Sequence, residues 1–118
     1  MYSIKIEADF SSAHNLREYK GKCEELHGHN WKIEVVAEKS NLDKIGMVMD
    51  FKHLKSGLAR VLKNLDHKYL NDLPHFKKVN PTSENIAKFI YDALKRRVKE
   101  IKSVTVWENH SSSATYGE

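Results

Sequence analysis

The chain has 118 residues, which suits one hydrophobic core, and we expect residues 1–118 to form a single domain. Hydrophobic residues make up 40% and charged residues 31%, which argues against a disordered chain, and no apolar run reaches the roughly 20 residues that span a bilayer. The net charge of +4 comes from basic and acidic residues that are mixed along the chain, so no nucleic-acid or membrane partner is expected. The single cysteine, Cys23, cannot form an internal disulfide, which favours a cytoplasmic setting.

Periodicity predicts the secondary structure. Alternating apolar and polar residues predict strands over 2–10 and 27–38, and the short apolar segment 47–49 is interpreted as a hairpin partner. Apolar residues at three- and four-residue steps predict one helix after Asp50 and a second helix with Pro81 in its first turn. A basic stretch, "LKRRVKEIK", is interpreted as the solvated end of the second helix. A last strand is predicted over 103–109, followed by a short tail.

This order of elements predicts an α+β fold, with an antiparallel four-stranded sheet and two helices on one of its faces. The edges of such a small sheet are open, and open edges often pair with another subunit. We therefore expect an oligomer.

Strand parity points to a metal site. His27 and His29 share the apolar face of their strand, and the apolar face of the first strand continues to His14. If the two strands are neighbours, three imidazoles meet. Three histidines and a vacant fourth position are typical of a catalytic zinc site, whereas Cys23 as a fourth ligand would make a structural zinc site in a non-catalytic module. Both interpretations stay open at this point.

Further polar residues fit a reaction centre. Glu108 continues the apolar face of the last strand, so its carboxylate lies either at the strand end or in a pocket. Asp66 and His67 are either a solvated pair at a helix end or a carboxylate that orients an imidazole. Cys23 has polar neighbours, which favours a part-exposed thiol that acts as a base.

Six segments in order resemble the 6-pyruvoyl-tetrahydropterin synthase / 6-carboxy-tetrahydropterin synthase family. They are "FSSAH" at 10–14, "CEELHGH" at 23–29, "GMVMDF" at 46–51, "LDHKYLN" at 65–71, "NPTSEN" at 80–85 and "WEN" at 107–109. The resemblance covers nearly the whole chain.

The resemblance implies the tunnelling fold, in which trimers close their sheets into a β-barrel and two trimers stack into a homohexamer with active sites between subunits. The implied residues of the site, each carried over from a matching motif, are His14, His27 and His29 as ligands of Zn²⁺, Cys23 as the base, Asp66 and His67 as its relay, and Glu108, Thr82 and Ser83 as holders of the pterin.

The implied reaction converts 7,8-dihydroneopterin triphosphate to 6-carboxy-5,6,7,8-tetrahydropterin, acetaldehyde and triphosphate, on the route to 7-deazaguanines such as queuosine and archaeosine. The short spacing in "CEELHGH" resembles the 6-carboxy enzymes rather than the 6-pyruvoyl enzymes. Glu24, directly after Cys23, is a candidate second base, because relatives in the folate route place a glutamate near here and form 6-hydroxymethyl-dihydropterin. That route is the main enzymatic alternative.

Overall fold

The computed structural model describes residues 1–18 and 25–118. Its elements, in chain order, are β1 (Tyr2–His14), β2 (His27–Lys39), α1 (Phe51–Leu62), the 3-10 helix η2 (Leu70–Asp72), α2 (Pro74–Lys78), α3 (Ser83–Lys95), β3 (Ile101–Asn109) and β4 (Ser112–Gly117). Cys23 and Glu24 lie outside the described residues. No helix in the described part of the chain is long and apolar enough to cross a membrane.

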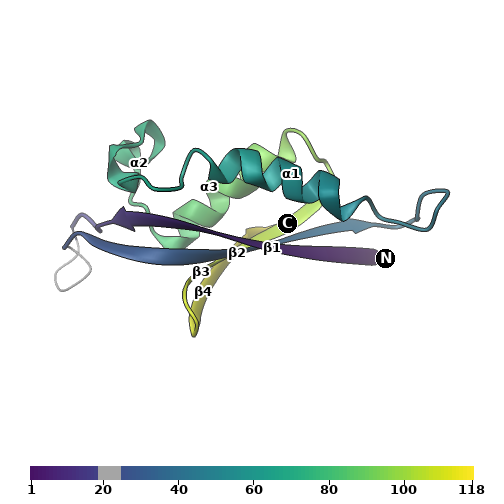
Figure 1. Ribbon diagram of the computed structural model, residues 1–118, viewed down its shortest axis with the longest axis horizontal. Helices are drawn as coiled ribbons and strands as arrows, with labels where there is room; N and C mark the ends of the chain where they lie inside the picture. Colours follow the sequence, from purple (N-terminus) through teal and green to yellow (C-terminus); the bar gives the residue numbers. More distant parts are fainter. Residues whose placement is uncertain (19–24) are drawn as a thin grey trace.

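The four strands form one antiparallel sheet in the order β1-β2-β3-β4, and the helices cover one face of it (Figure 1). The predicted α+β fold with a four-stranded sheet is confirmed. Apolar residues of β1, β2 and β3 pack against α1 and α3, and Trp31, Ile33 and Val35 in β2 are fully buried. The long strands β1 and β2 pair along their whole length, which places His14 opposite His27 at one end of the sheet.

The two main helices begin at side-chain caps. Asp50 accepts a hydrogen bond from the backbone N–H of Lys52, as expected for the residue before α1. Thr82 caps α3 by accepting from the backbone N–H of Asn85. Pro81 therefore precedes the cap instead of lying in the first turn of the helix, which corrects the expectation for that residue.

The predicted strand over 47–49 is wrong. This segment is irregular and follows a turn over 43–47, in which the Asp43 carboxylate accepts from the backbone N–H groups of Ile45 and Met47, and Gly46 has a φ of +86°. The fourth strand is instead β4, in the predicted tail. Its residues are mostly small and polar, so they carried little strand signal, but Tyr116 packs on the core and its ring meets that of Tyr91. The connection after α1, expected to be irregular, contains η2 and α2.

Candidate metal centre and its surroundings

Three imidazoles and one carboxylate converge where β1 and β2 meet the end of β3. His14, His27, His29 and Glu108 each offer one ligand atom, and these atoms all lie within 4.8 Å of one another. Oε1 of Glu108 lies 2.9 Å from Nε2 of His29, 3.6 Å from that of His14 and 3.9 Å from that of His27. The geometry follows from strand parity, since the histidines project from the same face as the buried Trp31.

The protein backbone sets the tautomers of two histidines. Nδ1 of His14 donates to the carbonyl of Pro81, and Nδ1 of His27 donates to the carbonyl of Glu25, each over 2.7 Å. In the neutral rings both Nε2 atoms then carry lone pairs, yet they face each other at 2.9 Å. Two acceptors at that distance repel, and a cation that binds both lone pairs removes the conflict.

His29 gives a second indication. Its Nε2 is buried and lies 2.9 Å from Oε1 of Glu108, but among the described residues it makes no hydrogen bond of good geometry. A buried ring nitrogen without a well-formed hydrogen bond is costly, and coordination to a metal would satisfy it. The residues present therefore fit a metal ion, and imidazole nitrogens are ligands that zinc accepts.

Burial keeps the cluster in its metal-binding protonation state. His14 is only 2% exposed, and desolvation lowers its pKa, with a further lowering by nearby His27. Burial also lowers the pKa of His29, against the charge of Glu108, which raises it. Under the cluster, the Trp31 ring packs edge-on against both His14 and His29, at centroid distances of 4.9 and 5.1 Å. The packing of Trp31 therefore restricts the orientation of the His14 and His29 rings.

Asp66 and His67 form the predicted pair beside β1. Nδ1 of His67 lies 3.0 Å from a carboxylate oxygen of Asp66, and the same carboxylate accepts from the backbone N–H of Ser11. That backbone hydrogen bond is the main reason why the pKa of Asp66 is lowered. The His67 ring is largely exposed, and His67 and His29 both line one open depression. The pair thus neighbours the metal centre without belonging to the cluster.

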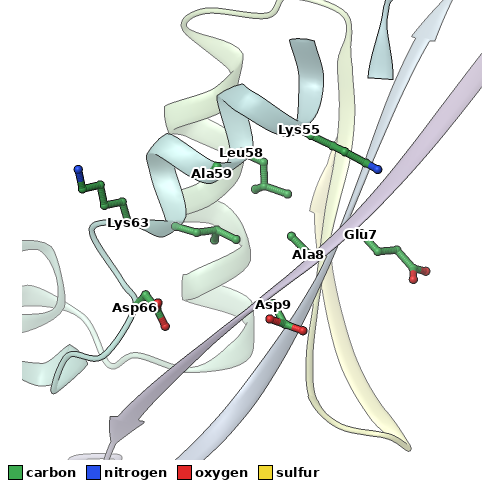
Figure 2. Close-up of a pocket in the computed structure, with 9 residues that line it drawn as sticks. Glu7, Ala8, Asp9, Lys55, Leu58, Ala59, Lys63 and Asp66 are labelled. Atoms are coloured by element: carbon green, nitrogen blue, oxygen red, sulfur yellow. The ribbon is translucent and has the colours of Figure 1, made fainter. Parts of the chain in front are cut away.

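A separate cavity of about 500 Å³ lies between α1 and β1. Figure 2 shows Asp66 and Asp9 at one end of it, with Lys55 of α1 and Lys63, the residue after α1, among the other lining residues. None of the three histidines lines this cavity, so the chemistry of the site lies elsewhere.

Thr82 and Ser83 lie next to the residue that orients His14. Thr82 is engaged as the cap of α3, and Ser83 is buried. Reasoning from sequence missed the carbonyls of Pro81 and Glu25, which no side-chain pattern signals. It also missed Asn71 and Asn80, whose side chains bind the backbone just after His14.

Fold and site together define an α+β protein with a three-histidine candidate metal site between two paired strands. The chain matches the family of 6-pyruvoyl tetrahydropterin synthase over residues 3–118, and it belongs to that family of synthase-type enzymes.

Two curated relatives and one solved structure illustrate the similarity. The chain is 41% identical to a 6-carboxy-5,6,7,8-tetrahydropterin synthase of Synechocystis, covering 98% of this chain and 93% of the relative. It is 38% identical to a dihydroneopterin monophosphate aldolase of Pyrococcus furiosus, over 91% of this chain and 90% of the relative. A 6-pyruvoyl tetrahydropterin synthase structure from Caenorhabditis elegans superposes with a TM-score of 0.91 at 30% identity, covering 99% of this chain and 95% of that one.

Proposed function

We propose that the protein is a zinc-dependent 6-carboxy-5,6,7,8-tetrahydropterin synthase that acts on 7,8-dihydroneopterin triphosphate and releases acetaldehyde and triphosphate. The observation that carries the proposal is the convergence of three Nε2 atoms, two of them with tautomers set by backbone carbonyls. The similarity to 6-carboxy enzymes, among them those of Synechocystis and Aquifex aeolicus, supports this product over others.

In this proposal His14, His27 and His29 hold the zinc ion. The ion supplies Lewis-acid chemistry, which lowers the pKa of substrate hydroxyls and stabilises developing negative charge on oxygen. The three exposures differ: His14 is buried, whereas the side chains of His27 and His29 are 28% and 23% exposed, so the site opens on that side.

The remaining roles follow the residue chemistry. Cys23 is the proposed base, and Asp66 and His67 are the proposed proton relay for it. In this pair the Asp66 carboxylate orients the imidazole through Nδ1 of His67. Glu108 anchors the pterin, because a carboxylate accepts two adjacent N–H donors in bidentate fashion. Thr82 and Ser83 lie at the N-terminus of α3 and complete the pterin site.

A homohexamer with active sites between subunits is part of the same proposal. In the described residues the outer edge of β1 is paired only near its end, through Ser11 and Ala13, and β4 is the opposite edge. Two open edges on one sheet suit closure into a barrel with other subunits.

Product analysis tests the proposal. Zinc-loaded protein is incubated with 7,8-dihydroneopterin triphosphate and the products are identified by mass spectrometry, with Cys23→Ala and Glu24→Ala in parallel. We expect 6-carboxytetrahydropterin, lost with Cys23→Ala and retained with Glu24→Ala. Zinc content and far-UV circular dichroism of each variant show whether a loss of product reflects lost chemistry or lost structure.

The second candidate is the folate-route reaction that forms 6-hydroxymethyl-dihydropterin. It is favoured by the adjacent Cys23 and Glu24 and by the similarity to the Pyrococcus furiosus aldolase. A 6-hydroxymethyl product that depends on Glu24 would establish it. Absence of turnover with any pterin, together with unfolding of Cys23→Ala, would instead support a structural zinc module.

The Glu108→Gln variant tests whether Glu108 binds the pterin or the metal ion. We expect this variant to keep its zinc and to lose at least about 100-fold in kcat/KM, because the neutral amide replaces a charged acceptor of the pterin N–H groups with a weaker one. Loss of zinc from Glu108→Gln would make the carboxylate a metal ligand instead.

A further inference from the structure

Two segments of the chain contain basic residues and no acidic ones. Residues 51–63, which contain α1, and residues 93–99, at the end of α3, together carry eight of the 20 Lys and Arg residues and none of the 16 Asp and Glu residues. The rest of the chain is therefore net acidic. Along the sequence these segments are about thirty residues apart, so their joint effect appears only in the fold.

The fold places the two segments side by side around a cavity of about 270 Å³. Its lining consists of His53, Ser56, Gly57 and Arg60 from α1, and Arg97 and Val98 from the turn after α3. His53, Ser56 and Arg60 recur at three- and four-residue steps, so they share one face of the helix. The two helices pack closely here, since a Cβ at Gly57 would be in ordinary van der Waals contact with a Leu94 methyl group, at 3.7 Å.

The guanidinium groups of this cavity lack acidic partners. Within the described ranges, no carboxylate lies within ion-pair distance of Arg60 or Arg97, and no acidic residue lines the cavity. Arg17 also has no acidic partner among the described residues, but its guanidinium donates to the backbone carbonyls of Phe76 and Val79. Two guanidinium groups in one cavity repel each other, and a bound anion would relieve that repulsion.

We propose that this cavity binds a small oligophosphate anion of the inorganic triphosphate class, with Arg60 and Arg97 as its main ligands. The planar fork of a guanidinium matches the oxygens of a phosphate group, and the Ser56 hydroxyl and His53 ring add donors. The neighbouring cations of α1 raise the local anion concentration. Lys55 and Lys63 line the cavity between α1 and β1, and the Lys95 ammonium donates to the carbonyls of Lys99 and Ile101. These lysines therefore contribute to the positive potential around the site without lining it.

This site is distinct from the metal centre. None of the cluster residues lines the cavity, and α1 lies toward the N-terminal half of β1, whereas α2 lies by its C-terminal end (Figure 1). The proposal is independent of the proposed reaction, because it concerns binding alone.

Isothermal titration calorimetry with inorganic triphosphate, in 150 mM salt, tests it on the zinc-loaded full chain. We expect saturable binding that weakens about tenfold or more in Arg97→Gln and in Arg60→Gln, because each loses a charge-assisted fork. Arg96→Gln is the matched control: it removes the same charge one residue away, and Arg96 does not line the cavity. Its affinity should stay within about threefold of the wild type, the effect of one screened surface charge.

The His27→Ala variant locates the anion. Binding that survives in this variant, without bound zinc, places triphosphate away from the metal centre, whereas its loss overturns the proposal. Equal losses in Arg96→Gln and Arg97→Gln would reduce the effect to a general surface charge and would also overturn it. All three arginines are exposed, and circular dichroism confirms that their variants are folded.

Discussion

The side-chain amide of Asn71 binds both backbone polar groups of Asn15. Its carbonyl oxygen accepts from the Asn15 N–H over 3.0 Å, and its amide donates to the Asn15 carbonyl over 2.9 Å. Asn71 is buried, and Asn15 directly follows His14. This contact ties the end of β1 to the 3-10 helix η2 and holds the chain where it leaves the metal centre.

Asn71→Ala should lower the free energy of unfolding by about 1–3 kcal/mol, because it removes the two hydrogen bonds between the buried Asn71 amide and the part-buried backbone of Asn15. It should also weaken metal binding, since the backbone next to His14 is released. Urea unfolding and a competitive zinc titration measure the two effects. Asn64→Ala is the control: the exposed Asn64 side chain makes only a long hydrogen bond of 3.5 Å to the Arg60 carbonyl within the described residues, and both quantities should stay near those of the wild type.

His27→Ala should weaken zinc binding by at least about 100-fold, because it removes a ligand and not merely a group that orients one. A chromogenic chelator competition gives the affinity, and elemental analysis gives the zinc content. His110→Ala, on the exposed turn between β3 and β4, should bind zinc like the wild type. Full zinc content in His27→Ala would contradict the assigned ligand set.

The metal-free protein should lose stability as the pH falls below about 6.5. The pKa of His14 is lowered in the folded state from an ordinary value of 6.5, so protons bind more tightly to the unfolded chain. The contribution of His14 is complete above that value and is lost as the pH falls through the lowered folded pKa; His29 acts in the same direction. Urea midpoints between pH 8 and 5, with chelator present, measure it.

His14→Asn should flatten this pH dependence, because the buried titrating ring is gone. Asp66 does not interfere, since its pKa is lowered from 3.8 and it titrates below this window. An equally steep pH dependence in His14→Asn would place its origin elsewhere.

Thr82→Val should lower the free energy of unfolding by about 1 kcal/mol, because the isosteric side chain cannot accept the hydrogen bond from the Asn85 N–H at the start of α3. Thr82→Ser keeps the hydroxyl and should restore most of the loss. Since the preceding Pro81 carbonyl holds Nδ1 of His14, zinc affinity should follow stability in these two variants. A rise in KM with unchanged stability would instead show that the hydroxyl serves the substrate alone.

The sequence alone determined which side chains share a face. Alternation along 27–38 and 103–109 placed His27, His29 and Glu108 on the core side of their strands, and the cap at Asp50 follows from local hydrogen bonding. These features depend on neighbours within a few residues. For the same reason the local pattern misled at 47–49, where three apolar residues form an irregular segment between a turn and α1. It also overlooked β4, whose strand character depends on pairing with β3.

Only the tertiary structure decided how these faces meet. The pairing register places His14 opposite His27, and the fold brings the Pro81 carbonyl to His14 from 67 residues away. Neither contact can be predicted from the residues near it in the sequence. The same holds for the basic cavity: two segments that look like ordinary solvated helix ends become one site because α1 packs beside the end of α3. The sequence specifies which side chains are present and which face of a strand or helix they share, whereas the packing of the whole core sets the distances between segments that are far apart in the sequence.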